Sequence, residues 1–343
     1  MTTKNLTVNK LMIKEKKVKK KKITPIKSVS KKANSKTQPK IGLNTLKDFK
    51  KPYYETSLGQ CFHGDSLELL EKIPANSIDL ILTSPPFALT RQKEYGNKAE
   101  HEYIEWFLQF ARQFYRILNE KGSLVIDLGG AYMPGHPVRS IYQFELLVKL
   151  CRELNFFLAQ EFFHYNPSRL PTPAEWVTIR RIRVKDSVNV VWWLSKTEYP
   201  KSDNKKILKP YSKSMKSLLK NGYKAQMRPS GHDISDKFGN DNGGAIPANL
   251  LELANTESNS SYLRKCKEFG VKPHPARFPK EFAEFFIKFL TDENAVVLDP
   301  FAGSNTTGYA SEVLKRKWLS FEINESYLSG SKFRFEKNDN EKT

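Results

Sequence analysis

The chain has 343 residues, of which 39% are apolar and 12% aromatic, enough to bury a substantial core. Its three cysteines include no CxxC pair, which argues against a disulfide framework or a cysteine-ligated zinc site and indicates a cytoplasmic protein. No apolar run approaches the roughly 18 residues of a membrane span. The six histidines are scattered without metal-ligand spacing, so neither a membrane anchor nor a metal is predicted.

The net charge of +20 is distributed unevenly. Residues 1–40 hold fourteen lysines and a single acid, Glu15, and therefore carry +13 of the total. This segment has almost no aromatic residues and no apolar periodicity, which predicts a disordered tail. It is either an arm that binds a polyphosphate backbone without reading sequence, or a dispensable extension from an upstream start codon. The rest of the chain is still basic, which favours a polyanionic partner such as nucleic acid.

Strands and helices alternate along residues 59–196. The pattern predicts strands within 59–65, 77–87, 121–132, 156–165 and 187–196, and helices from Ser66, over 101–118 and over 140–154. Asp65 precedes the first of these helices as a candidate N-cap, three residues before Glu68. An arginine-rich loop occupies 166–186. Such alternation is typical of a doubly wound, mostly parallel α/β sheet.

Residues 197–272 interrupt this alternation. They are polar, rich in lysine, serine, asparagine and glycine, and short of long periodic elements, so an inserted lobe or a set of long surface loops is predicted. The α/β pattern resumes with a helix within 274–290, a strand within 295–304, a helix over 305–316 and a strand over 317–324.

The motif "VVLDPFAGSNTTG" is the first that indicates chemistry. A strand ends in Asp299, a small-residue turn follows, and Thr306 lies in the first turn of the next helix, as in folds that bind a nucleotide at the carboxyl ends of their strands. Glu322 ends the next strand, where an acid can accept hydrogen bonds from both ribose hydroxyls. The turn lacks G-x-G-x-x-G and carries no lysine for a pyrophosphate. S-adenosylmethionine, an adenosine without phosphates, therefore fits better; the alternative is an ordinary strand–turn–helix with a capping acid.

A third strand beside this pair is expected from earlier in the chain, because the sequence ends about 20 residues after Glu322. The candidate is "CFHGDS", which would place Asp65 where its carboxylate accepts from an adenine amino group. The same aspartate can also cap the helix that begins at Ser66.

The segment "TSPPF" ends another predicted strand in a stiff ledge, because two prolines remove two backbone donors and fix two φ angles. A planar exocyclic amine is a poor nucleophile, and acceptors for its protons help its nitrogen become tetrahedral. Ser84 Oγ and the Pro85 carbonyl could accept, Pro86 adds stiffness, and Phe87 could stack on a base flipped out of a duplex. Taken alone, such a segment is more often a plain strand-ending turn.

Together "TSPPFAL", "HPARFP", "DPFAGSNTTG" and "SFEIN" resemble the amino-directed DNA methyltransferases of bacterial restriction–modification systems, and within them the permuted β-group cytosine-N4 enzymes. The resemblance runs from about Tyr53 to Phe335. It implies a seven-stranded, Rossmann-like methyltransferase fold, circularly permuted so that the donor-binding half follows the catalytic half. The implied domains are a disordered tail at 1–40, a catalytic half at 41–196, a target-recognition region at 197–272, an S-adenosylmethionine-binding half at 273–335 and a C-terminal tail at 336–343.

The resemblance also implies the roles of individual residues. Ser84 would contact the target amine and Phe87 the base, while Asp127 in "VIDLGG" would accept or relay a proton; a carboxylate that merely caps the following turn is the alternative for Asp127. The implied contacts to the methyl donor are Asp65, Pro275, Phe278, Asp299, Pro300, Phe301, Gly303, Thr306 and Glu322. One position departs from the commoner Phe-Ala-Gly-Ser-Gly turn: Asn305 stands last, and asparagine tolerates positive φ and caps helices well.

The function that follows is methylation of cytosine N4 in a specific duplex site by S-adenosylmethionine, protecting the DNA from a partner restriction endonuclease in a bacterial cytoplasm, with association to the nucleoid. The site would be short and palindromic, such as CAGCTG by likeness alone. Adenine-N6 methylation is the nearest alternative, although serine at the first ledge position favours cytosine. A non-catalytic basic DNA-binding protein is the alternative from another class, and it gives no reason for the ledge and the donor motif to occur together.

Overall fold

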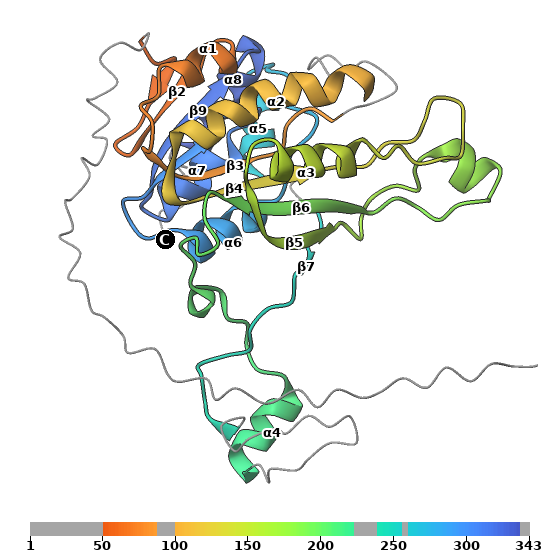
Figure 1. Cartoon of the computed structure of the whole chain (residues 1–343), viewed down its shortest axis with the longest axis vertical. Coiled ribbons are helices and arrows are strands. Elements are labelled where there is room, and N and C mark those ends of the chain that lie inside the picture. Colours follow the sequence, from red (N-terminus) through yellow and green to blue (C-terminus); the bar gives the residue numbers. More distant parts are fainter. Residues whose placement is uncertain (1–50, 88–99, 223–238, 256–259, 337–343) are drawn as a thin grey trace, which may run out of the picture. The chain divides into compact units, whose positions relative to one another are not determined.

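A computed structural model describes residues 51–87, 100–222, 239–255 and 260–336 (Figure 1). The predicted tail at 1–40, nearly all of the C-terminal tail and residues 223–238 of the predicted target-recognition region lie outside the described residues. Across those described ranges, no helix is both long enough and apolar enough to cross a membrane.

The described residues form one sheet of nine strands in the order β1-β2-β9-β8-β3-β4-β6-β5-β7. The strands are β1 (Tyr54–Glu55), β2 (Gly59–His63), β3 (Ile78–Thr83), β4 (Leu118–Leu128), β5 (Phe157–Tyr165), β6 (Val188–Ser195), β7 (Leu250–Glu252), β8 (Val296–Asp299) and β9 (Lys317–Glu322). From β2 to β4 all neighbours are parallel, whereas β6 lies antiparallel between β4 and β5. The predicted α/β fold with a mostly parallel sheet is confirmed.

Two short strands extend the predicted seven. β1 has two residues and β7 has three, so neither is long enough to show an apolar period in the sequence. The seven longer strands, from β2 to β5 in the sheet order, correspond to the predicted ones.

The last two strands of the chain enter the sheet between two of the first. β9 pairs with β2, which places Glu322 beside His63, and β8 pairs with β3. The segment "CFHGDS" is therefore the third strand beside the β8–β9 pair, as predicted. This arrangement brings the carboxyl ends of β2, β3, β8 and β9 to one edge of the sheet, although they lie more than 200 residues apart in sequence.

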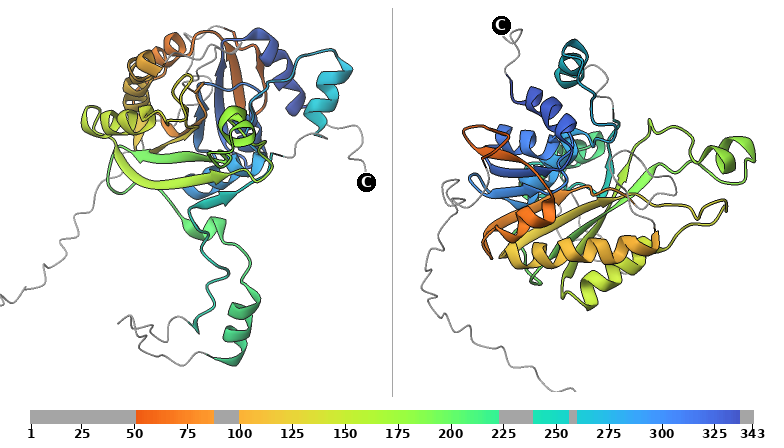
Figure 2. Two further views of the ribbon diagram at one scale, coloured as in Figure 1. Left: turned by 90° about the vertical axis from the view of Figure 1, so that its right-hand side faces the viewer. Right: turned by 90° about the horizontal axis from the view of Figure 1, so that it is seen from above.

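Helices cover both faces of the sheet (Figure 2). Apolar residues of α1, α2 and α3 share a core cluster with Ile81 of β3, while α6 and α7 pack on Leu80 and Leu82 of the same strand. This alternation follows from the two-residue period of a strand. The helices are α1 (Ser66–Glu71), α2 (Glu100–Ile117), α3 (Tyr142–Arg152), α4 (Lys213–Asn221), α5 (Ser261–Glu268), α6 (Lys280–Leu290), α7 (Thr306–Val313) and α8 (Glu325–Ser331), with shorter turns at Glu175–Ile179, Asn204–Ile207 and Lys332–Arg334.

The predicted helices agree with the structure in place and in buried face. Of the aromatic residues at helical spacing in α2, Tyr103, Phe107 and Phe114 are fully buried, and Trp106 is partly buried. Leu118, counted with that helix in the sequence, instead begins β4. At the other end of the chain, α6 begins directly after Pro279, as a helix entered through prolines should.

Residues 197–272 are only partly separate from the rest of the fold. The backbones of Lys209 and Ala245 exchange hydrogen bonds of 2.9 and 2.8 Å, which closes the base of the excursion that contains α4. Beyond that excursion β7 joins the main sheet beside β5, and α5 is tied to the C-terminal segment by an ion pair of 3.0 Å between Lys265 and Glu336. The predicted bounds of a target-recognition region remain a prediction; within them, the helix α4 has no buried residue.

Candidate active site

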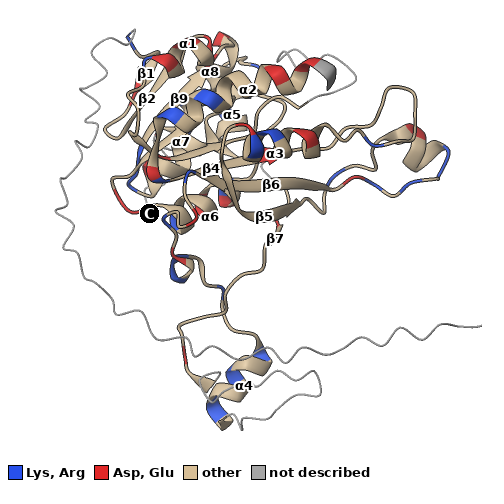
Figure 3. Ribbon diagram, viewed as in Figure 1, with Lys and Arg blue, Asp and Glu red and all other residues tan. Residues whose placement is uncertain are grey.

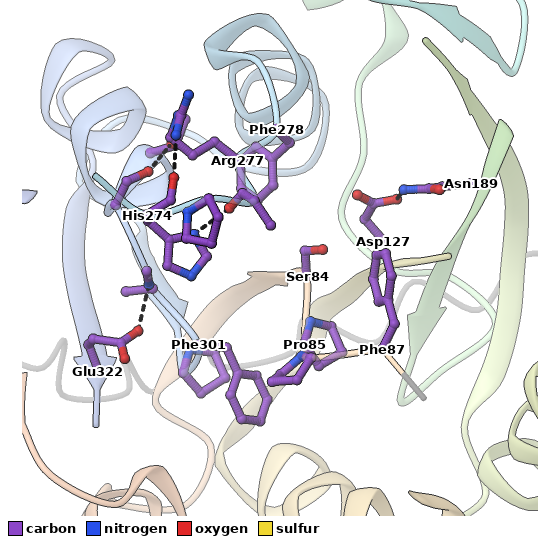
Figure 4. A pocket seen from close by; sticks show the side chains of 18 of the residues that line it. Ser84, Pro85, Phe87, Asp127, Asn189, His274, Arg277, Phe278, Phe301 and Glu322 are labelled. Carbon is purple, nitrogen blue, oxygen red and sulfur yellow. Dashed lines mark hydrogen bonds between the residues drawn. The ribbon is translucent and has the colours of Figure 1, made fainter. Parts of the chain in front are cut away.

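A cavity of about 520 Å³ opens at the carboxyl ends of β2, β3, β4, β8 and β9 (Figure 4). Thirteen of the fourteen residues predicted to form the site line it: Asp65, Ser84, Pro85, Pro86, Phe87, Asp127, Pro275, Phe278, Pro300, Phe301, Gly303, Thr306 and Glu322. The ledge and the donor motif were predicted from distant parts of the chain, and the sheet order brings them into one cavity.

The ledge follows β3 directly and is braced from two sides. Thr83, the last residue of the strand, donates its hydroxyl to Asp299 Oδ1 over 2.8 Å, tying β3 to β8. On the other side the ring of Phe87 lies against the backbone of Gly129: a Cβ at that position would stand 2.4 Å from a ring carbon. Glycine is therefore required at 129 to leave room for the ring. Figure 4 shows Ser84 and Pro85 facing the cavity.

Asp127 is the next-to-last residue of β4, and its carboxylate is buried, 3% exposed. Its Oδ1 accepts a hydrogen bond of 3.0 Å from Asn189 Nδ2 of β6, and its Oδ2 lies 3.8 Å from Nδ1 of His164 on β5. Within the described residues no backbone amide of the following turn donates to it. The geometry thus lacks the capping contact that was the alternative for this residue.

Asp299 is the one predicted site residue that does not line the cavity. It is 2% exposed and lies behind the turn, where it accepts hydrogen bonds from Thr83 Oγ1, Thr307 Oγ1 (2.7 Å) and the Phe301 amide (3.1 Å). Burial raises the pKa of Asp299 to about 6, although these hydrogen bonds lower it in part. Asp299 therefore shapes the turn through these hydrogen bonds and does not line the cavity.

The turn itself depends on two left-handed residues. Gly303 has φ of 51° and donates its amide to Glu322 Oε2 over 2.8 Å. Asn305 has φ of 53° and caps α7, accepting from the Gly308 amide. Its side chain also accepts from Ser320 Oγ over 2.7 Å and donates to Tyr54 over 2.8 Å. Asparagine in place of the commoner glycine thus adopts the expected conformation and cap.

Glu322 and Asp65 are the carboxylates of the donor half. Glu322 is 9% exposed; its Oε2 accepts from Gly303 and its Oε1 from the Asn324 amide, both at 2.8 Å. Burial raises the pKa of Glu322, and the backbone amides oppose that shift. A carboxylate has about four acceptor positions, so both oxygens keep capacity for a ligand. Asp65 caps α1 as predicted, accepting from the Leu67 amide over 2.7 Å.

Several lining residues were not predicted. Trp106 and Phe110 of α2 pack on Phe301, with ring centroids 5.8 and 5.1 Å apart; their helical spacing gave a core signal only. His164 and Asn189 lie on β5 and β6, and only the strand pairing shows that they meet Asp127. No sequence signal of a single element could have identified these two.

His274 also lines the cavity. Its Nδ1 lies 2.5 Å from the Ala276 carbonyl, and its ring stands edge-on to Tyr327 at 4.5 Å. Burial lowers the pKa of His274 to about 4, so the ring is neutral near pH 7.

The cavity suits an adenosine-type methyl donor by the chemistry of its lining. Carboxylate oxygens of Glu322 and Asp65 can accept from hydroxyl and amino groups, and Phe278 and Phe301 offer rings. The described lining holds no lysine, and its two arginines, Arg169 and Arg277, lie outside the turn at 300–305. Among the described residues no cluster of three or more His, Cys, Asp or Glu side chains is arranged to hold a metal ion.

Comparison with known proteins gives a family and close relatives. A family described as DNA methylase matches residues 78–333. Type II methyltransferase M.PvuII of Proteus hauseri is 56% identical over 83% of this chain and 86% of its own length. Type II methyltransferase M.BamHI of Bacillus amyloliquefaciens is 27% identical over 87% of this chain and 62% of its own.

Solved structures of DNA methyltransferases also resemble this chain. The PvuII DNA methyltransferase, described as cytosine-N4-specific, superposes with a TM-score of 0.70 at 50% identity, covering 84% of this chain and 90% of that one. A DNA modification methylase of Thermus thermophilus, solved in complex with S-adenosyl-L-methionine, has a TM-score of 0.51 at 18% identity and covers 81% of this chain and 93% of that one. The second likeness concerns the fold alone.

Proposed function

The chain belongs to the DNA methylase family matched by residues 78–333, and on that premise we propose that it transfers a methyl group from S-adenosylmethionine to N4 of cytosine in a specific duplex DNA site. The observation that carries this function is the meeting of the Ser-Pro-Pro-Phe ledge and the donor turn in one cavity. The 56% identity with M.PvuII, whose solved counterpart is cytosine-N4-specific, favours cytosine over adenine and enzymatic activity over DNA binding alone.

In the donor half, the chain's own residues bind and orient the donor. Glu322 accepts hydrogen bonds from the ribose hydroxyls, and Asp65 accepts from the adenine amino group. Glycine suits position 303, because a Cβ there would lie 3.1 Å from the His274 ring and the residue has a positive φ. When bound, S-adenosylmethionine supplies an electrophilic methyl group on a sulfonium sulfur.

In the catalytic half, the ledge prepares the amine. Ser84 Oγ and the Pro85 carbonyl accept hydrogen bonds from its two N–H groups as the nitrogen becomes tetrahedral, and the rigid prolines fix the directions of both acceptors. Phe87 stacks on the flipped base and is itself held against Gly129. Asp127, buried and held by Asn189, is the carboxylate that accepts or relays the released proton. These acceptors stabilise the transition state more than the bound substrate, and therefore raise the rate of methyl transfer.

Duplex DNA is the polyanion that the basic chain binds. Arg169 lines the cavity, and Arg180, Arg181 and Arg183 follow on the exposed loop that joins β5 to β6 (Figure 3). Lysines of α4 carry further positive charge in the region proposed for target recognition. The proposal includes a short palindromic site, CAGCTG being the candidate, a cognate restriction endonuclease without direct contact, and a bacterial cytoplasmic location at the nucleoid.

The test is to express the protein in a host lacking this modification and to challenge the host DNA with a panel of restriction nucleases. We expect protection at one short palindrome, with N4-methylcytosine mapped there by sequencing. N6-methyladenine at the protected site would contradict the choice of base, and unprotected DNA without modified bases would contradict the function.

A further inference from the structure

His164, the next-to-last residue of β5, lines the cavity and has no place in the function described so far. Strand pairing fixes its position: His164 lies opposite Asn189 of β6, and β6 pairs in turn with β4, near whose end Asp127 lies. The side chain is 7% exposed. Its ring packs on Phe282 of α6 with centroids 5.0 Å apart. The imidazole is therefore held in one place, in the wall beside the ledge.

Both ring nitrogens of His164 are buried, and among the described residues neither has a hydrogen-bond partner. A neutral imidazole carries one N–H donor and one acceptor, and buried polar groups in folded proteins are normally paired. Leaving both unpaired lowers the stability of the fold. A buried, unpaired imidazole in a cavity wall therefore points to a group that it meets during the reaction.

Asp127 is that group. Its Oδ2 lies 3.8 Å from His164 Nδ1, longer than a hydrogen bond but within reach of a small side-chain rotation. Its Oδ1 accepts a hydrogen bond of 3.0 Å from Asn189 Nδ2. Arg169 Nη1 in turn donates to the side-chain Oδ1 of Asn189, also over 3.0 Å. One carboxylate oxygen is thus fixed, and the other is turned toward His164.

The surroundings contain few other charges. Around His164, β4 presents Asp127, and β6 presents Asn189, which links to the guanidinium of Arg169. On the remaining sides β7 pairs through Leu251 and α6 packs through Phe282. From these elements Asp127 is the charged group in contact with the imidazole, and Arg169 reaches it through Asn189.

We propose that Asp127 and His164 act as a pair that takes up the proton released by the target amine, with His164 as a positioning residue that works through Asp127. This inference rests on the proposed function. As the N4–methyl bond forms and the methyl–sulfur bond breaks, N4 is left with one proton too many. The electrons of that N–H bond stay on N4, and the proton passes to the Asp127 carboxylate. The imidazole then shares the proton between Oδ2 and Nδ1, so the pair goes from net negative to neutral.

Proton uptake by a pair predicts a specific effect on the pH dependence of methylation. In single-turnover assays from pH 5 to 8 we expect the wild-type rate to rise through an inflection, because only the deprotonated pair can take up a proton. His164→Gln should lower the plateau about 10-fold, less than the roughly 100-fold or more of a fully lost general base, because Asp127 remains, and it should remove or displace the inflection. Affinities for S-adenosylmethionine and DNA should stay within about twofold. His136→Gln, at an exposed histidine outside the cavity lining, is the matched control and should behave as wild type.

A profile of unchanged shape in His164→Gln, or a loss confined to binding, would overturn the pairing. A measurement that needs no activity supports the test: ¹⁵N-histidine spectra of the free protein, simple because the chain has only six histidines. Asp127→Asn should shift the Nδ1 signal of His164 and leave that of His136 in place; an unmoved His164 signal would contradict contact between the two. Wild-type protein that fails to methylate cytosine would instead contradict the proposed function itself.

Discussion

Replacing Glu322 with glutamine tests the donor half of the cavity with the smallest change in shape. In the folded protein each carboxylate oxygen already accepts a backbone amide at 2.8 Å, one from Gly303 and one from Asn324. Glutamine keeps one acceptor but places an NH₂ group against the other amide. The variant therefore loses the negative charge and one of the oxygens that would face the ribose.

The magnitude follows from the type of bond. A hydrogen bond to a charged group contributes about 1.5–3 kcal/mol, which corresponds to roughly 10- to 150-fold in the dissociation constant. Because Glu322 is only 9% exposed, solvent screening has little effect on the free energy of this hydrogen bond. Burial also raises the pKa of Glu322, so the carboxylate protonates at a higher pH than an ordinary glutamate. Donor affinity of the wild type should accordingly fall on acidification, whereas the glutamine variant should show no such fall.

Calorimetry of S-adenosylmethionine binding, with no DNA present, measures both effects. Glu325→Gln, exposed in the first turn of α8, is the matched control and should bind as wild type. Unfolding free energies of both variants separate a structural loss from a binding loss. Wild-type affinity in Glu322→Gln would refute the ribose contact, and so would an affinity loss that disappears once unfolded protein is accounted for.

Three further changes test other parts of the structure. Burial raises the pKa of Asp299 to about 6, so the folded state holds a proton that the unfolded chain releases near pH 4. The free energy of unfolding should therefore fall by about 2 kcal/mol as pH rises from 4 to 6. Asp299→Asn should flatten that pH dependence in urea unfolding, and an unchanged dependence would assign it to other groups. Gly129→Ala would place a Cβ 2.4 Å from the Phe87 ring and should slow turnover about 10-fold or more by displacing a stacked base. Gly330→Ala, where a Cβ would have ordinary contacts of 3.4 Å, is the control and should not slow turnover. Equal turnover in the two variants would mean that the Phe87 ring is not used. Deleting residues 1–40 removes thirteen net positive charges and should reduce the slope of log DNA affinity against log salt, while an unchanged slope would show that the tail does not touch DNA.

Local patterns predicted most of the fold and the two halves of the site. Asp65 caps its helix because the side chain and the amide that it meets are two residues apart. The segment "CFHGDS" was predicted to lie beside the two C-terminal strands, and β2 does pair with β9. Asn305 adopted the left-handed cap that its chemistry allows. These features depend on neighbours in sequence or on simple rules of sheet topology.

The features that the sequence did not predict depend on contacts between distant elements. Asp299 was expected in the cavity, but hydroxyls from Thr83 and Thr307 draw its carboxylate behind the turn. His164 and Asn189 meet Asp127 only through the register of β5, β6 and β4. Neither side-chain direction nor register is visible in the pattern of one strand.

Single-turnover methylation of duplex DNA by the wild type and Ser84→Ala, followed by separation of the product nucleosides, tests most directly whether the ledge activates a cytosine amine. The substitution leaves both prolines and Phe87 in place, so donor and DNA affinities should be retained. We expect N4-methylcytosine as the product and a rate about 100-fold lower in Ser84→Ala, since an acceptor used mainly in the transition state is lost. Methylated adenine as the product, or an undiminished rate in Ser84→Ala, would contradict this function for the ledge.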